Sequence, residues 1–471
     1  MANTYLAVDF GGGSGRVMAG TIIEGKLQLE EIYRFGNRQI KLGSHLYWDF
    51  PALYEDMKTG LKVAAQKGYS VNGIGIDTWG VDFGLIDKEG NLVCNPICYR
   101  DSRTEGIPEK VFKVIDEKEH YAVSGIQVMS INSLFQLYSM KIKNDVRLNV
   151  ADKLLFMPDL FSYYLTGEVA NEYSIASTSE LLDAKTRSWN KELIDSLGIP
   201  GHLFGKIIQP GTIRGKLTLE LAKETGLGEV CVIAVGSHDT ASAVVAVPSI
   251  ECDKAFLSSG TWSLLGTEVA EPILTETARN NKFTNEGGVG GNIRFLQNIT
   301  GLWILQRLMA EWELRGERIS YDDILKQASK TSFTNIINVD NHLFLNPESM
   351  ENAICKYFEN ASMKSPSNKA EFVLCVLKSL ACKYKKAINS MNECLERPIK
   401  QLHIIGGGSQ IDLLNQLTSN YLGIPVYAGP VEATAIGNIM VQALAKGEIK
   451  SMKELKDIVV ESISPKVYYP N

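Results

Sequence analysis

The sequence predicts an α/β protein made of two related domains. Each half opens with the same plan of a short strand, a tip rich in glycine or serine, and a second strand, at residues 5–23 and again at residues 254–269. Around these hairpins, apolar strands alternate with segments of helical spacing, which is typical of an α/β fold. With 471 residues the chain is also too long for one ordinary domain. We therefore expect an N-terminal domain over residues 1–245 and a C-terminal domain over residues 246–471.

Composition narrows the functional class. Hydrophobic residues make up 45% of the chain and charged residues 22%, as in an ordinary globular protein. A net charge of −6 argues against nucleic acid as a partner, and no apolar stretch is long enough to cross a membrane. The N-terminus begins a strand and lacks the basic region of a signal peptide, so we expect a cytoplasmic protein. The eight cysteines form no CxxC pair, which predicts free thiols and no structural zinc.

The first candidate for chemistry is Asp239, near the middle of the chain. Residues 230–235 form an apolar run typical of a buried strand, Gly236 and Ser237 interrupt it, and residues 241–247 have the spacing of a packed helix. Asp239 therefore lies where a strand turns into a helix, a place where α/β enzymes commonly carry reacting groups. The helix dipole would favour its carboxylate there. A simple N-cap, formed by Ser237 or Asp239, is the alternative that this stretch leaves open.

The first hairpin has a tip that is almost entirely glycine. Strand residues 5–9 end in Asp9, and residues 10–16 read FGGGSGR before the next strand begins. Backbone N–H groups without covering side chains can hold a phosphate, so this tip is a candidate phosphate site. It is not a Walker loop, because the Lys-Ser/Thr ending is absent and a strand follows instead of a helix. A plain tight turn remains the alternative.

A strand at residues 72–77 also ends in an acid, Asp77, and leads into TWGVDF at residues 78–83. Two carboxylates, a tryptophan and two glycines at this junction suit a small polyol, with hydrogen bonds for its hydroxyls and an aromatic face for its C–H groups. A buried tryptophan beside a β-bulge is the alternative. Residues 99–103, YRDSR, predict a surface ion-pair cluster or, alternatively, the lining of an anionic or hydroxyl-rich cleft.

The second half adds further glycine-containing segments. Residues 406–410, GGGSQ, follow a strand and open a helix, which is typical of a nucleotide-binding element, and residues 432–438 begin a helix of small residues. Residues 283–292, FTNEGGVGGN, predict a flexible loop. Asn298 and Gln306 are eight residues apart, so about two turns would separate them if both were helical.

Together these motifs resemble the FGGY family of carbohydrate kinases across essentially the whole chain. DFGGGSGR (residues 9–16), GTWS (260–263) and GGGS (406–409) are similar to the three nucleotide elements of that family. GIDTWGVDF (75–83), YRDSRT (99–104), GSHDTA (236–241) and QNITGLW (297–303) resemble its members that act on L-rhamnulose. The pair Gly12-Gly13 departs from the small Ala or Ser residues expected in the first element, a change that should keep its backbone exposed.

The resemblance implies two actin-like ATPase (ribonuclease-H-like) domains flanking a deep active-site cleft. The N-terminal domain would bind the sugar and carry the base and the phosphate hairpin, and the C-terminal domain would bind the nucleotide. The implied reaction is ATP-dependent phosphorylation of L-rhamnulose at O1, giving L-rhamnulose 1-phosphate and ADP, in L-rhamnose degradation. Two alternatives stay open: a kinase of L-fuculose, L-ribulose or D-xylulose, and a non-catalytic sensor with the actin-like ATPase fold.

The resemblance also implies site residues, each at a position that matches a family motif. The general base would be Asp239, and Asp9 would help to hold Mg²⁺ through water, since this ion keeps much of its hydration shell. The expected sugar-binding residues are Gly80, His238, Asp239, Thr240 and Asn298. The expected ATP-binding residues are Gly12, Gly13, Ser14, Gly15, Arg16, Thr261, Gln306 and Gly407. A monomer or a small homo-oligomer is expected, and pairing of Cys355 with Cys375 is left open.

Overall fold

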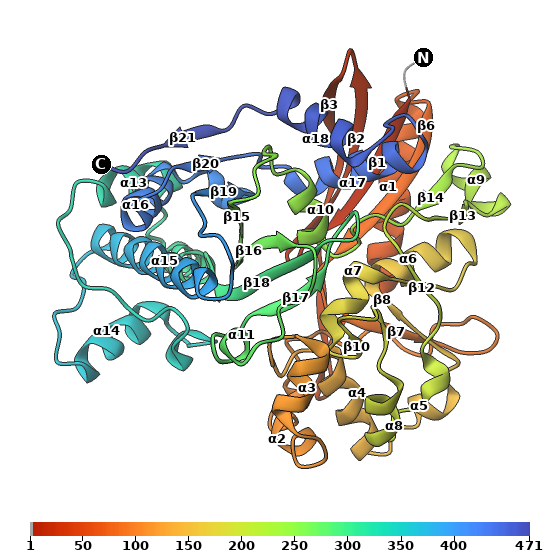
Figure 1. Ribbon diagram of the computed structural model, residues 1–471, viewed down its shortest axis with the longest axis horizontal. Helices are drawn as coiled ribbons and strands as arrows, with labels where there is room; N and C mark the ends of the chain where they lie inside the picture. The colour runs from red at the N-terminus through yellow and green to blue at the C-terminus, as the bar shows by residue number, and fades with distance from the viewer. Residues whose placement is uncertain (1–2) are drawn as a thin grey trace. The chain divides into compact units, whose positions relative to one another are not determined.

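Strands and helices alternate along the whole of the computed structural model, which describes residues 3–471 (Figure 1). The chain forms two units, each discontinuous in sequence. Unit 1 combines the N-terminal half up to Pro248 with Glu268–Phe295 and Ala433–Ser462. Unit 2 contains Ser249–Thr267, Leu296–Glu432 and Ile463–Asn471. The predicted α/β class is confirmed, while the division between residues 245 and 246 stays a prediction.

The main sheet of unit 1 has six strands. β1 pairs antiparallel with β2 and parallel with β6, and β6 pairs parallel with β14. In the β1–β2 hairpin Phe10 lies opposite Gly15, so the glycine-rich tip is its turn, as predicted. The strands, in their order across the sheet, are β13 (Ile213–Lys216), β14 (Cys231–Ile233), β6 (Val71–Thr78), β1 (Thr4–Phe10), β2 (Ser14–Ile23) and β3 (Lys26–Gly36).

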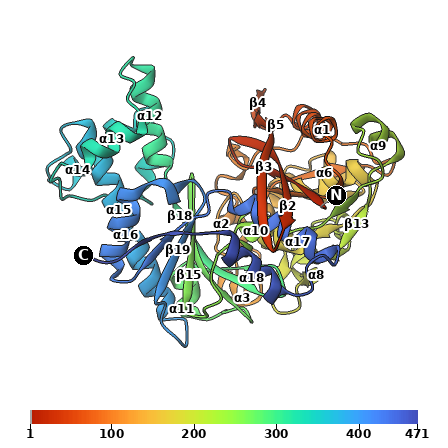
Figure 2. The same cartoon turned by 90° about the horizontal axis from the view of Figure 1, so that it is seen from above.

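Two small-residue helices, α10 (Asp239–Val245) and α17 (Ala433–Ala445), pack closely in unit 1 and lie side by side in both views (Figure 1, Figure 2). A Cβ added to Gly437 of α17 would overlap the carbonyl oxygen of Ser242 in α10. On the sheet side, a Cβ added to Gly75 of β6 would overlap the side-chain oxygen of Asn438. The predicted small-residue helix is therefore confirmed, and glycine permits the close approach on both of its faces.

The segment predicted as mostly helical, residues 107–225, consists of short helices joined by very short strands. The predicted capped helix is α6 (Met157–Thr166), which has Pro158 in its first turn and ends at Gly167 in the left-handed conformation. The other helices of unit 1 are α1 (Phe50–Gln66), α2 (Pro108–Val111), α3 (Glu117–Ser124), α4 (Ser133–Ile142), α5 (Arg147–Val150), α7 (Tyr173–Ala176), α8 (Lys191–Ser196), α9 (Leu219–Thr225), α11 (Glu276–Asn280) and α18 (Met452–Ser462). Its remaining strands are β4 (Gln39–Leu42), β5 (His45–Trp48), β7 (Phe83–Ile86), β8 (Lys153–Phe156), β9 (Asn171–Glu172), β10 (Leu182–Asp183), β11 (Ser188–Trp189), β12 (Ile207–Ile208) and β17 (Thr284–Gly287).

The second large sheet has seven strands in the order β17-β18-β16-β15-β19-β20-β21. As in the first sheet, an antiparallel hairpin, β15–β16, continues into a parallel neighbour, β19. The strands not yet given are β15 (Lys254–Ser259), β16 (Trp262–Val269), β18 (Ile293–Thr300), β19 (Gln401–Ile405), β20 (Val426–Ala428) and β21 (Lys466–Tyr468). The helices of unit 2 are α12 (Trp303–Leu314), α13 (Tyr321–Ala328), α14 (Met350–Asn360), α15 (Lys369–Asn392) and α16 (Asp412–Leu422).

One predicted element is wrong. Residues 283–292 were expected to form a flexible loop, but Thr284–Gly287 form strand β17, and all four residues are buried. The polar and glycine-rich composition suggests a loop, yet Gly287 is needed where the ring of Tyr173 packs against the strand, because an added Cβ would come within 2.5 Å of it.

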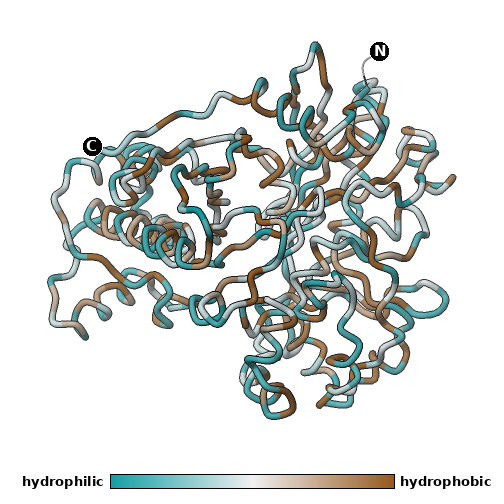
Figure 3. The backbone as a smooth tube through the Cα atoms, viewed as in Figure 1, coloured by the Kyte–Doolittle hydropathy of each residue, from teal (hydrophilic) through white to brown (hydrophobic). Residues whose placement is uncertain are grey.

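All eight cysteines are free thiols, including Cys355 and Cys375, whose pairing the sequence left open. Hydrophilic and hydrophobic segments alternate along the whole chain (Figure 3). None of the helices formed by residues 3–471 combines the length and the apolar character that crossing a membrane requires.

Replacing Gly437 with alanine tests the packing of α10 on α17. The new methyl group would overlap a backbone carbonyl of Ser242, which cannot rotate away. Alanine gains about 1 kcal/mol of helix propensity over glycine, whereas overpacking costs about 1–3 kcal/mol or more. We expect Gly437→Ala to lower the free energy of unfolding by about 1–2 kcal/mol in chemical denaturation.

The control for this measurement is Gly36→Ala, because a Cβ added at Gly36 meets nothing within 4 Å. It should change the free energy of unfolding by less than about 0.5 kcal/mol. If Gly437→Ala were as stable as this control, α10 would be free to shift away from α17.

Candidate active site

Three carboxyl groups of unit 1 are brought to one edge of its main sheet. Asp9 and Asp77 are partners in the parallel register of β1 and β6, near the carboxyl end of each strand. Next to Asp77, the N–H of Thr78 donates to the carbonyl oxygen of Ser237 at 2.9 Å, and Thr78 pairs with His238. Asp239 follows at the head of α10. Ligand sites of open α/β sheets commonly lie at this edge.

Asp77 is fully buried beside other negative charges. Nδ2 of Asn438 donates to its Oδ2 at 2.6 Å, whereas Oδ1 receives no hydrogen bond from residues 3–471. Burial raises the pKa of the Asp77 carboxyl well above its ordinary value, and the charges of Asp9 and Asp239 raise it further. The three carboxyl groups therefore act on one another electrostatically.

Asp9 is paired with Arg16, its cross-strand partner in the β1–β2 hairpin. Nε and Nη2 of Arg16 donate to Asp9 Oδ2 at 3.0 and 2.8 Å. The turn between them is open, since a Cβ added to Gly12 or Gly13 meets nothing within 4 Å. The structure therefore places Arg16 against a carboxylate, and the expected role of this arginine at a phosphate stays a prediction.

Asp239 is the first residue of α10 and does not cap it. The N-cap residue is His238, whose side chain makes no capping bond, so a simple N-cap at Ser237 or Asp239 is not what the turn provides. Oδ1 of Asp239 accepts from the N–H and hydroxyl of Thr240, at 2.5 and 3.1 Å, and the side chain keeps 32% of its surface exposed. Burial of the carboxyl raises its pKa; His238 lowers it and the charge of Asp9 raises it.

A buried carboxylate that the sequence did not indicate holds the turn before Asp239. Glu172 accepts the N–H groups of Ser237 and Ser174 at 3.2 and 2.7 Å, and the hydroxyl of Ser174 accepts the N–H of His238 at 3.2 Å. Burial raises the pKa of Glu172, although these donors oppose the shift. Arg214 pairs with Asp159, which in turn accepts the N–H of Glu172 at 3.1 Å.

His238 has two further partners that sequence reasoning missed. Nη2 of Arg294, on β18, lies 3.1 Å from Nδ1 of His238, and Oε2 of Glu286, on β17, lies 3.2 Å from the same nitrogen. Arg294 and Glu286 also pair with each other at 3.1 Å. Burial alone would raise the pKa of Glu286, but the positive charge of Arg294 and the contact with His238 lower it below its ordinary value. Glu286 lies in the segment predicted as a loop.

In the turn after β6, Trp79 and Asp82 are buried and Gly80 is partly exposed. Oδ2 of Asp82 accepts both indole N–H groups of Trp48 and Trp79, at 2.6 and 3.0 Å, and the N–H of Tyr99 at 3.1 Å. Trp79 is only 6% exposed, so the alternative of a buried tryptophan is correct here, and Asp82 is committed to internal donors. Gly80 is partly exposed, and an added Cβ would make ordinary contacts at 3.4 Å with Nε2 of His238 and the hydroxyl of Thr178.

Val81, the residue after Gly80, has a strained backbone conformation. Val81 has a φ of 67°, which is rare for a β-branched residue. The hydroxyl of Thr178 accepts its N–H at 3.2 Å, and the hydroxyl of Ser133 donates to its carbonyl oxygen at 2.5 Å. The strain therefore persists because two other segments of unit 1 fix this turn.

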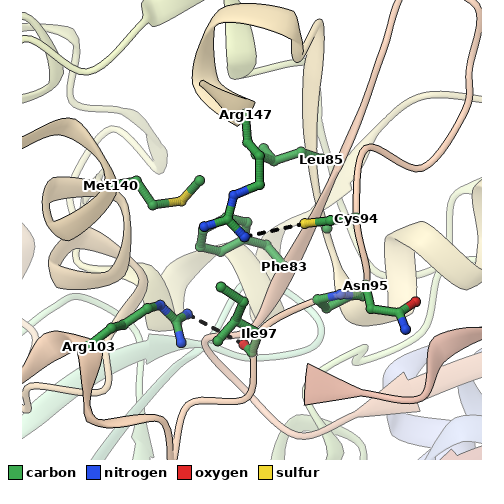
Figure 4. A pocket seen from close by; sticks show the side chains of 10 residues that line it. Phe83, Leu85, Cys94, Asn95, Ile97, Arg103, Met140 and Arg147 are labelled. Carbon is green, nitrogen blue, oxygen red and sulfur yellow. Dashed lines mark hydrogen bonds between the residues drawn. The ribbon is translucent and has the colours of Figure 1, made fainter. Parts of the chain in front are cut away.

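In the cluster at residues 99–103, Arg100 and Ser102 are exposed, but the paired side chains of Arg103 and Asp101 are only 5% and 3% exposed, so the expectation of a surface ion-pair cluster is wrong for these two. The guanidinium of Arg103 donates to Gln136 and to the carbonyl oxygen of Cys98. It lines a cavity of about 20 Å³, together with apolar side chains and with Arg147, whose Nη1 donates to Cys94 (Figure 4). Such a space admits a water molecule but neither a sugar nor a nucleotide.

In unit 2 the predicted nucleotide elements lie together. A Cβ added to Gly408 would overlap the hydroxyl of Ser259, so the glycine loop after β19 touches the end of β15. The hydroxyl of Thr261 donates to Oε1 of Gln306 at 3.1 Å, and a Cβ added to Gly407 meets nothing within 4 Å. Asn298 lies on strand β18 and Gln306 on helix α12, so these two do not share a helix.

Metal binding at this site would depend on few protein ligands. Residues 3–471 contain no group of three His, Cys, Asp or Glu side chains arranged to hold a metal ion. A cation nevertheless suits the sheet edge, because it would offset the repulsion between carboxylates that raises the pKa of Asp77, whose Oδ1 receives no hydrogen bond from the described residues. Mg²⁺ fits such a site, because it commonly binds through one or two carboxylates, waters and substrate phosphates.

Removing the Asp82 carboxylate tests its support of the tryptophan pair. Asp82→Ala leaves two buried indole N–H groups without an acceptor, each at a cost of about 1–3 kcal/mol. We expect the free energy of unfolding to fall by about 2–5 kcal/mol in urea, with a shift in tryptophan emission. Asp87→Ala, in the partly exposed turn after β7, is the control and should cost less than about 1 kcal/mol. Equal stability of the two variants would contradict the role of Asp82.

Curated relatives match the chain along its full length. It is 47% identical over 471 residues to the rhamnulokinase of Bacteroides thetaiotaomicron, covering 100% of this chain and 96% of the relative. It is 38% identical over 467 residues to the rhamnulokinase of Bacillus subtilis, covering 99% of this chain and 95% of the relative.

Solved structures share the fold. Gluconate kinase and a ligand-bound xylulose kinase from Lactobacillus acidophilus superpose with a TM-score of 0.83 at 16% and 17% identity, covering 100% of this chain and 94% of each structure. The expected two-domain fold of actin-like, ribonuclease-H-like type is therefore confirmed. Residues 4–246 match the N-terminal domain, and residues 255–446 the C-terminal domain, of one family. The chain belongs to the FGGY family of carbohydrate kinases.

Proposed function

We propose that this carbohydrate kinase transfers the γ-phosphoryl group of ATP to O1 of L-rhamnulose, giving L-rhamnulose 1-phosphate and ADP. The family makes it an ATP-dependent phosphotransferase acting on a sugar. Full-length identity of 38–47% to relatives named rhamnulokinase supports the choice of sugar. The observation that carries the chemistry is the carboxylate of Asp239, partly buried but 32% exposed, next to His238, which in turn adjoins Gly80.

Asp239 is the proposed general base. In the transfer, the O1–phosphorus bond forms as the bond from phosphorus to the ADP oxygen breaks, and the O1 proton passes to Asp239. Because burial raises the pKa of this carboxyl, it is a stronger proton acceptor than an exposed aspartate. Its exposed fraction of 32% leaves it accessible to a substrate hydroxyl.

The ketose would lie against the residues around Asp239. Gly80 has no side chain beside Nε2 of His238, where an added Cβ would lie at 3.4 Å, so a substrate hydroxyl could approach the backbone and the imidazole together. We assign Gly80, His238, Thr240 and Asn298 to sugar binding. The strained turn at Val81 and the hydrogen bond from Trp79 to Asp82 fix the backbone on both sides of Gly80.

The ATP phosphates and nucleotide are assigned to glycine-rich turns in each unit. In unit 1 these are Gly12 to Gly15 with Arg16, in a hairpin turn whose backbone is uncovered at Gly12 and Gly13, whereas Gly15 lies under the ring of Phe35. In unit 2 they are Thr261, Gln306 and Gly407, which lie on the two touching loops and on α12. Glycine in these turns lets a phosphate approach the backbone closely.

Mg²⁺ would be held by Asp9 through water, and it would neutralise charge on the phosphates during transfer. The pair with Arg16 keeps the Asp9 carboxylate fixed in orientation at the end of β1. Asp77, buried between Asp9 and the Asn438 amide, supports this carboxylate from the neighbouring strand.

A coupled ADP-release assay over a panel of ketoses tests the substrate. L-Rhamnulose should give the highest kcat/KM, ahead of L-fuculose, L-ribulose and D-xylulose. A preference for one of the others would make the chain a different sugar kinase of the family. ADP release that no ketose stimulates would point to a non-catalytic sensor instead.

The variant Asp239→Asn tests the general base. Asparagine keeps the size and the acceptor for Thr240, but it loses the charge and the basicity. We expect kcat to fall about a hundredfold or more, while ATP and L-rhamnulose still bind and the unfolding midpoint stays close to that of the wild type. Turnover is measured by ADP release and binding by calorimetry.

The matched control is Asp116→Asn, which changes an aspartate at the N-terminus of α3. Its turnover should equal that of the wild type. Near-normal turnover of Asp239→Asn as well would remove Asp239 from the reaction.

A further inference from the structure

Two buried charged residues that no assignment so far uses contact His238. Arg294 is 0% exposed and Glu286 4% exposed, and they come from neighbouring strands β18 and β17. Both face Nδ1 of the imidazole. Since His238 lies next to the proposed base, the protonation of its two ring nitrogens matters for the sugar site.

The directions of these contacts differ. An N–H of Arg294 Nη2 points at Nδ1 of His238 with hydrogen-bond geometry at 3.1 Å. Oε2 of Glu286 is 3.2 Å from Nδ1, but it receives no aligned hydrogen bond from residues 3–471. A guanidinium can only donate, so Nδ1 must be the acceptor. A hydrogen on Nδ1 would point at the hydrogen of the arginine.

We propose that Arg294 fixes neutral His238 in the tautomer with its hydrogen on Nε2, so that His238 donates a hydrogen bond to a ketose hydroxyl. Arg294 is then a positioning residue, and Glu286 keeps its buried charge balanced. The identity of the ligand, a ketose, rests on the proposed function.

The atoms around Nε2 of His238 leave this nitrogen able to donate a hydrogen bond to a substrate. Its near neighbours are Oδ1 of Asp239 at 3.4 Å and the side-chain-free position of Gly80. A distance of 3.4 Å to Asp239 is long for a good hydrogen bond, so a hydroxyl placed beside both atoms could accept from Nε2 and donate to the carboxylate. The tautomer would therefore leave Asp239 as the only proton acceptor for O1.

Further contacts hold the guanidinium of Arg294 beside the ring. Arg294 makes an ion pair with Glu286 at 3.1 Å, and its Nε donates to the carbonyl oxygen of Gly287 at 2.9 Å. These contacts keep the N–H of Nη2 directed at Nδ1, so a hydrogen on that nitrogen would meet the hydrogen of the arginine. Asp239, on the other side of the ring, is the negative group that Nε2–H faces.

Nuclear magnetic resonance of the ligand-free protein tests the tautomer directly. With ¹⁵N-labelled histidine the chain has six imidazoles, and His238→Gln identifies the His238 signals by their loss. We expect a pyrrole-type Nε2 and a pyridine-type Nδ1 for His238. A pyrrole-type Nδ1 or a doubly protonated ring near neutral pH would overturn the proposal.

Kinetics of a double variant test the consequence. Arg294→Leu with Glu286→Leu removes the ion pair together, which avoids leaving one buried charge unpaired. We expect the KM for L-rhamnulose to rise about tenfold while the KM for ATP stays within about twofold, since one donor to the sugar is lost. The Nδ1–H tautomer should also become populated.

Unchanged tautomer and unchanged ketose KM in the double variant would overturn the role of Arg294. Glu286→Gln is the matched control, because it keeps the donor of Arg294 and should keep the tautomer. If the double variant fails to fold, the ¹⁵N spectrum of the wild type still shows which tautomer His238 adopts. Absence of ADP release with L-rhamnulose in the wild type would count against the proposed function alone, since the spectrum needs no substrate.

Discussion

The candidate active site depends on one constraint: three aspartates lie close together at one edge of the main sheet of unit 1. Parallel pairing of β1 with β6 places Asp9 beside Asp77, and the turn after β14 adds Asp239. Carboxylates that lie this close disfavour one another's charged forms. The structure relieves this with Arg16 on Asp9 and the amide of Asn438 on Asp77. Asp239 is left exposed at the edge, where a substrate can reach it.

Holding Asp239 in place needs packing as well as charge. The short helix α10 is pressed against α17 by a glycine contact, so its first residue cannot drift. The turn before it is bound to Glu172, which also begins α7, and the Asp159–Arg214 pair supports Glu172 from below. Buried carboxylates with several donors are rigid supports, because losing one donor leaves a buried charge unsatisfied.

Local patterns in the sequence predicted local features well. The glycine hairpin tip, the strand-to-helix turn at Asp239 and the small-residue helix α17 all follow from short runs of residues whose periodicity and glycine content are diagnostic. These runs also carry the motifs that indicated the family. The match to family and fold is therefore the part that the sequence predicts best.

Partners that meet only after folding were missed. Asn438 reaches Asp77 across 361 residues of sequence, and no periodicity joins them. Glu172 lies among short helices whose pattern suggested no chemistry, and Glu286 lies in a strand whose polar, glycine-rich composition resembles a loop. Asp82 was considered for polyol binding, but two indole N–H groups occupy it, which only the fold can bring about.

Asp239 differs from the other carboxylates around the site in the partner with which it forms an ion pair. Asp9 is paired with Arg16, Glu286 with Arg294, and Asp159 with Arg214. An arginine partner favours the charged form of a carboxylate: Arg294 lowers the pKa of Glu286, whereas at Asp159 burial outweighs Arg214 and raises the pKa to about 7. Among residues 3–471, the ion-pair neighbour of Asp239 is the imidazole of His238, whose Nδ1 already accepts from Arg294. Burial raises the pKa of Asp239 and His238 lowers it, so the basicity of this carboxylate depends on the balance between the two.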